Sequence, residues 1–129
     1  MAVSEAIKGQ ARELFSDLGE VAIKLMFGGA GLYIDGMMFG LIAGEVVHLK
    51  VDDETEAAFI EAGSAPFIFL MRDGRQAPLR YWRLPDVAAD DPEEAARWGR
   101  LALDAALRAK RPKSKAKARA DIGPGPWDG

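Results

Sequence analysis

The fold is decided by the segment Met26-Phe27-Gly28-Gly29-Ala30-Gly31-Leu32-Tyr33-Ile34-Asp35-Gly36-Met37-Met38-Phe39-Gly40. It contains three glycines within four positions, an apolar run, an Asp-Gly pair and a second apolar run. Asp-Gly between two apolar runs is typical of a β-hairpin with a type I′ turn, because both central residues of that turn take positive φ. We therefore predict strands over Leu32–Ile34 and Met37–Ala43, which the rest of the chain covers.

The composition is that of a single globular domain. The chain has 129 residues, of which 49% are hydrophobic, so it can bury a core without the support of disulfides or metal ions. It has no cysteine, which excludes disulfides and thiolate metal sites. The N-terminal segment lacks the pattern of a signal peptide, and no apolar run approaches the roughly 18 residues that span a bilayer. We expect a cytoplasmic protein that uses neither a membrane nor a cofactor.

Helical periodicity marks both ends of the domain. An apolar stripe behind Ser4, a plausible N-cap, predicts a helix over Ser4–Asp17 with one buried side. Asp91-Pro92-Glu93-Glu94 predicts the start of a last helix, which Pro112 ends. Between them, Asp53-Glu54-Thr55-Glu56 resembles a capping box, with Asp53 as the cap of a short helix that runs to about Ala62.

The remaining apolar runs predict strands. Val21–Phe27 is a weaker strand that the glycines interrupt, and Val46–Val51 alternates as a half-buried strand with one wet face. Phe67–Arg72 and Ala77–Leu84 form a further hairpin around Asp73-Gly74. We expect an α+β fold in the order α-β-β-β-α-β-β-α, with one antiparallel sheet and both long helices on one of its faces.

The end of the chain differs from the rest. Residues 1–107 contain ten basic and eighteen acidic residues, so residues 1–111 form an acidic domain. Residues 112–129 are basic and rich in Gly and Pro, which predicts a disordered tail. The basic residues at this end are Arg108, Lys110, Arg111, Lys113, Lys115, Lys117 and Arg119. Their seven charges can release about six counterions from a duplex without reading its bases; the alternative is a solvated tail that binds nothing.

A family resemblance rests on the opening segment. The pattern Met26-Phe27-Gly28-Gly29-x-Gly31-x-Tyr33-x-Asp35-Gly36-x-Met38-Phe39-Gly40 is similar to the N-terminal domain of the TfoX/Sxy family of bacterial competence regulators, and the resemblance extends over roughly residues 8–110. It implies a fold similar to type III secretion chaperones, a role in transcriptional regulation through a protein partner, and no catalytic residues. Full-length regulators carry a second, helical domain, whereas this chain ends in the short tail.

The same glycines allow two interpretations. They can cradle a phosphate, or they can serve a tight connection where only glycine fits. Phosphate loops run from a strand into a helix, whereas these glycines run into another strand, which favours the structural interpretation. A pocket between the helices and this hairpin would support an alternative function, the binding of a small ligand.

The usual catalytic and metal-binding patterns are missing from the sequence. His48 is the only histidine and is expected on the wet face of its strand, as an ordinary surface residue. No serine lies in a nucleophile elbow, and the acidic clusters at the helix starts are explained by capping. We therefore expect a protein that is not an enzyme.

The second hairpin is the candidate partner surface. It contains Arg72, Arg75, Arg80, Tyr81 and Arg83. Interleaved arginines and aromatics can bind a single strand by stacking or form an interface with a protein. In the alternative, Trp82 belongs to the core and the arginines pair with the acidic body. We expect a protein partner, weak and non-specific DNA binding by the tail, and an oligomeric state that could be a homodimer, since the edge strands lack clear protection.

Overall fold

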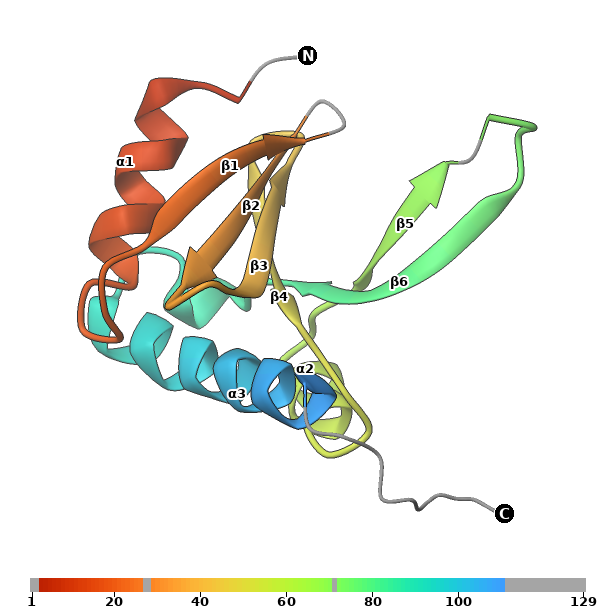
Figure 1. The fold of residues 1–129 in the computed structure, drawn as a ribbon. Helices are drawn as coiled ribbons and strands as arrows, with labels where there is room; N and C mark the ends of the chain where they lie inside the picture. The colour runs from red at the N-terminus through yellow and green to blue at the C-terminus, as the bar shows by residue number, and fades with distance from the viewer. Residues whose placement is uncertain (1–2, 27–28, 71, 111–129) are drawn as a thin grey trace.

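The computed structural model describes residues 3–26, 29–70 and 72–110 (Figure 1). Its elements follow in the order α1 (Glu5–Leu14), β1 (Ala22–Met26), β2 (Gly29–Ile34), β3 (Met37–Ala43), β4 (Val46–Lys50), α2 (Glu56–Glu61), β5 (Pro66–Leu70), β6 (Gln76–Arg83), the 3-10 helix η1 (Asp86–Ala88) and α3 (Pro92–Lys110). None of the described helices is long and apolar enough to cross a membrane.

The strands form one antiparallel sheet in the order β1-β2-β3-β4-β6-β5, which confirms the predicted architecture. Four strands precede α2, one for each strand segment predicted there, whereas the predicted order counted three. The glycines do not interrupt the sheet: β2 begins at Gly29, which pairs with Met26 of β1. The β5–β6 hairpin extends away from the helices, and β6 joins it to the rest of the sheet (Figure 1).

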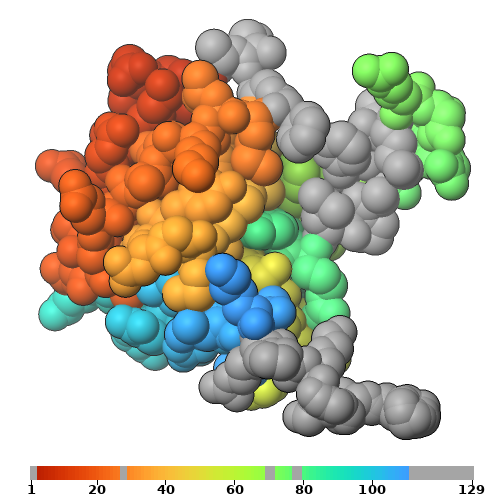
Figure 2. Space-filling view, in the orientation of Figure 1, coloured from red at the N-terminus to blue at the C-terminus, as the bar shows by residue number. Residues whose placement is uncertain are grey.

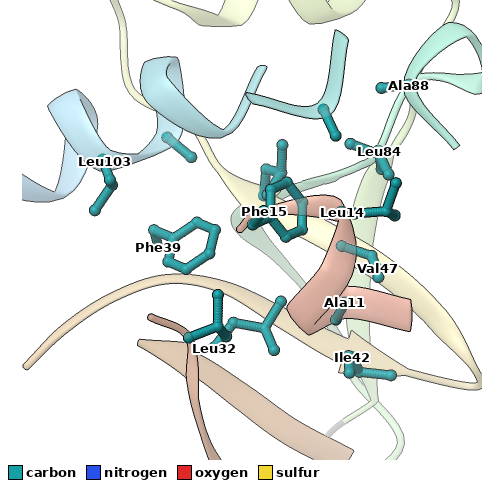
Figure 3. Close-up of a cluster of buried hydrophobic side chains, with 14 of the residues drawn as sticks. Ala11, Leu14, Phe15, Leu32, Phe39, Ile42, Val47, Leu84, Ala88 and Leu103 are labelled. Carbon is teal, nitrogen blue, oxygen red and sulfur yellow. The ribbon is translucent and has the colours of Figure 1, made fainter. Parts of the chain in front are cut away.

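The long helices α1 and α3 lie on one side of strands β1–β4 (Figure 1), as expected. The core lies between these layers, where Phe15, the C-cap of α1, meets Phe39 of β3 edge to face, with ring centroids 5.3 Å apart (Figure 3). Leu32, Ile42 and Leu49 are fully buried on the same face of the sheet. Burial of such side chains contributes roughly 1.5–3 kcal/mol each, so this face holds the domain together.

Several local signals of the sequence act as predicted. The Ser4 side chain accepts a hydrogen bond from the Ile7 N–H at 3.2 Å and caps α1. The Asp91 carboxylate accepts one from the Glu93 N–H at 3.0 Å, at the start of α3. Asp35 and Gly36 have φ of 52° and 78°, so both take the positive φ of a type I′ turn.

The start of α2 differs from its prediction. Asp52, not Asp53, organises this turn: one oxygen of its carboxylate accepts hydrogen bonds from the Glu54 N–H at 3.1 Å and the Thr55 hydroxyl at 3.3 Å. The helix itself begins at Glu56, after Thr55. Asp52 is held there by Arg108 of α3, a partner far away in sequence that no local pattern reveals.

Candidate functional site: the outer face of the sheet

The second face of the sheet is formed by alternate residues of the same strands. The register places Lys24, Gly31, Leu41, His48 and Arg83 side by side in one row across five strands. A neighbouring row adds aromatic and apolar side chains. The outer face, as we call it, consists of Lys24, Met26, Gly31, Tyr33, Met38, Leu41, His48, Lys50, Tyr81 and Arg83.

Gly31 is the floor of this face. A Cβ on Gly31 would lie 2.9 Å from Cε1 of Tyr33, 3.1 Å from Sδ of Met26 and 3.3 Å from Cε of Met38. These three side chains therefore lie over its bare backbone. All four residues belong to the segment that carries the family resemblance, so part of that segment builds the outer face.

The other strand glycines of the segment serve close packing of the backbone. A Cβ on Gly29 would collide with the carbonyl oxygen of Ile42, and one on Gly40 would lie 2.8 Å from that of His48. Gly29 and Gly40 are absent from the positive-φ glycines of the described chain, so close approach explains them. They lie within strands and do not precede a helix, which removes the phosphate-cradle interpretation for them. Phe27 and Gly28 lie outside the described residues.

Two lysines of the outer face lie on tyrosine rings. The ammonium of Lys24 is 4.9 Å from the ring centroid of Tyr33, and that of Lys50 is 5.2 Å from the centroid of Tyr81. Neither lysine takes part in an ion pair among the described residues. Burial raises the pKa of the Tyr81 phenol, and the negative charge that Tyr33 carries when ionised raises it further. The face therefore combines basic charge with aromatic surface.

His48 is not the surface residue that its strand pattern predicts. It lies on the outer face, but only 8% of it is exposed, because Phe67 of β5 packs against its ring with centroids 5.0 Å apart. Its Nδ1 lies 3.1 Å from the carbonyl oxygen of Val46. Burial lowers the pKa of the imidazole, so His48 is a neutral packing residue that joins the β5–β6 hairpin to the sheet.

Most arginines of the predicted partner surface have acidic partners. Arg80 lies 3.1 Å from Asp53, Arg83 lies 3.3 Å from Asp86, and Arg75 lies 2.7 Å from Asp73. Arg72 is exposed. Of the aromatic pair, Trp82 packs against the core, whereas Tyr81 lies on the outer face. The hairpin thus offers less uncompensated charge than its sequence suggests.

The basic end of the chain begins later than the sequence suggests. Arg108 belongs to α3, and its guanidinium binds the Asp52 carboxylate at 2.6 and 3.0 Å. This pair lowers the pKa of Asp52, chiefly through the hydrogen bond. Lys110 is the last residue of α3. The other predicted DNA-binding residues, from Arg111 to Arg119, lie outside the described residues.

A small hollow lies where the outer face meets the end of α3. Its volume is about 260 Å³, and Tyr33, Met38, Lys50, Tyr81, Ala109 and Lys110 are among the residues that line it. We call it the tyrosine pocket. It is located between the glycine-rich hairpin and a helix, where the small-ligand hypothesis requires a pocket. In the described chain, no group of three or more His, Asp or Glu side chains is placed to hold a metal ion.

These features define the class of the protein: an α+β domain whose single antiparallel sheet has one face packed under helices and the other formed by basic and aromatic side chains. The chain belongs to the TfoX N-terminal domain family, whose model matches residues 13–106, from within α1 into α3. It is therefore a TfoX-like regulatory domain. Comparison with curated proteins gave no match.

Proposed function

We propose that the chain is a non-enzymatic regulatory module that acts in transcription by binding a protein partner, and that its outer face is the binding surface. The observation that carries the proposal is the pair of lysines stacked on Tyr33 and Tyr81 without a carboxylate partner among the described residues. Tyrosine and arginine are enriched among the residues that supply most of the binding energy of protein interfaces. The family supports the regulatory role.

The charge pattern indicates the chemistry of that partner. The domain as a whole is acidic, yet Lys24 and Lys50 lie on the outer face without a carboxylate partner among the described residues. Arg83, which pairs with Asp86, lies in the same row as Lys24. A complementary surface is acidic, with apolar groups that meet Met26 and the tyrosine rings. Such complementarity increases the rate of association and excludes basic partners.

Site-specific photo-crosslinking in the source cell tests the surface. A photoreactive phenylalanine analogue replaces exposed Lys24 in one variant and exposed Arg12 of α1, on the helical layer, in the control. We expect the Lys24 variant, but not the Arg12 variant, to form an adduct with one acidic protein. Adducts only from the Arg12 variant, or none from the Lys24 variant, would refute the assignment of the outer face.

A second copy of this chain is the other candidate partner, because β1 and β5 are the edge strands of the sheet. Light scattering coupled to size exclusion separates the two. A monomer over a wide concentration range contradicts self-association and leaves the foreign partner as the proposal.

A further inference from the structure

The tyrosine pocket is a candidate binding site for a ligand other than the protein partner. We propose that it binds a small organic anion, a carboxylate or phosphate group attached to a flat apolar body. The pocket shares Lys50 and both tyrosines with the outer face, but Ala109 and Lys110 of α3 belong to the pocket alone, and the tests below measure binding of the small ligand without a partner protein.

Five elements build the pocket. Tyr33 and Met38 come from the β2–β3 hairpin, Lys50 from β4, and Tyr81 from β6, while Ala109 and Lys110 close it from the last turn of α3. In Figure 2 this end of α3, in blue, lies against the orange residues of the hairpin. The volume of about 260 Å³ is below the usual range of roughly 300–1,000 Å³ for drug-sized ligands, so the ligand is small.

The polar groups of the lining select an anion. The lining residues with polar side chains are Lys50, Lys110, Tyr33 and Tyr81, and the described lining contains no carboxylate. The ammonium of Lys50 is held over the Tyr81 ring, so it is already positioned without a counter-charge among the described residues. An anion would receive charge-assisted hydrogen bonds from both lysines. Their two full charges exceed the partial negative charge of about one half at the C-terminus of α3.

The apolar residues of the lining favour a ligand whose anionic group is attached to a flat apolar ring. Met37, Met38, Ala106 and Ala109 face the hollow together with the two tyrosine rings. Inorganic phosphate would leave these surfaces wet, whereas a flat ring can stack on tyrosine and displace water from the methionines. A ligand that fits the lining therefore has both an anionic group and an apolar ring.

Nuclear magnetic resonance titration of the full chain with four compounds tests both parts. Benzoate and phenyl phosphate have both an aromatic ring and an anionic group. Benzamide has the ring without the charge, and inorganic phosphate has the charge without the ring. We expect benzoate or phenyl phosphate to cause saturable amide shifts at Tyr33, Lys50 and Tyr81, and the other two compounds to bind at least about tenfold more weakly. The stronger of the first two identifies the anionic group.

Substitutions locate the site. Lys50→Met keeps the apolar stem and should weaken binding about tenfold, whereas Lys50→Arg should retain most of it. Lys8→Met on α1 is the charge-matched control and should change nothing. Lys110→Met gives a second measurement if Lys50→Met does not fold. Shifts that map elsewhere, equal binding of benzamide, or full affinity in both lysine-to-methionine variants would overturn the proposal.

Discussion

At the scale of single residues, Gly29 and Gly31 have different neighbours, so the cost of an added methyl group should differ between them. At Gly31 the neighbours are the ends of flexible side chains, which can move. At Gly29 the neighbour is the carbonyl oxygen of Ile42, which is fixed by the sheet. Gly31→Ala should cost about 1 kcal/mol of unfolding free energy and Gly29→Ala about 3 kcal/mol or more. Urea denaturation measures both, and equal costs would contradict the assigned contacts.

His48 predicts a dependence of stability on pH. Burial lowers its pKa in the folded protein, whereas the unfolded chain binds the proton near pH 6.5. The stabilising contribution is therefore present above pH 6.5 and is lost as the pH falls toward the lowered folded pKa, with a slope of at most about 1.4 kcal/mol per pH unit. Between pH 7 and 5, the unfolding free energy should fall in the parent and change less in His48→Phe. Parallel curves would show that the imidazole does not titrate differently on folding.

Residue chemistry was readable from sequence where the neighbours are local. Ser4, Asp91 and the Asp35-Gly36 turn depend on backbone groups within a few positions, and all act as predicted. His48 was misjudged because Phe67, which covers it, comes from another strand. Alternation gives the face of a strand, but it does not show what lies over that face.

At the scale of elements, the Arg108–Asp52 pair joins the end of α3 to the connection between β4 and α2. Only 27% of each side chain is exposed, and the guanidinium makes two short hydrogen bonds to the carboxylate. Arg108→Met should cost about 2 kcal/mol of unfolding free energy. The matched control, Arg75→Met, removes an exposed pair with Asp73 and should cost less than about 0.5 kcal/mol.

The Arg108–Asp52 pair also predicts how the unfolding free energy depends on pH. Because Arg108 lowers the pKa of Asp52, its contribution is present above the ordinary pKa of the carboxyl, near 4, and is lost as the pH falls through the lowered folded value. The difference between parent and Arg108→Met should therefore shrink in acid. A difference that persists unchanged at pH 2 would assign the loss to packing of the arginine stem instead.

The pattern of elements was readable because helices and strands have different periods, and turn residues separate them. The sheet order was not fully readable. Glycines within four positions look like an interruption, yet Gly29 and Gly31 pair with Met26 and Lys24 and make β2 a full strand. The small-ligand hypothesis gave the location of a pocket but not the residues that line it. The residues of the tyrosine pocket come from five elements, so no short motif could list them.

At the scale of the whole molecule, charge separates the acidic domain from its basic end. Arg108 is bound to Asp52, and Lys110 lines the tyrosine pocket, so the charges left for DNA are the five between residues 111 and 119. The structure does not describe these residues. Their effect on DNA binding is therefore predicted from charge alone. The basic residues attract a polyanion, whereas the acidic domain repels it.

Five phosphate contacts predict a measurable salt dependence. Fluorescence anisotropy with a duplex should give a logarithm of the binding constant that falls by about 4 to 5 per tenfold increase in salt, with no preference for sequence. A chain ending at residue 110 should lose this binding, whereas Lys24→Met, which neutralises one charge on the outer face, should retain it. If the shortened chain binds equally, or if the full chain fails to bind at low salt, the tail does not contact DNA. Regulation would then rest on the protein partner proposed for the outer face.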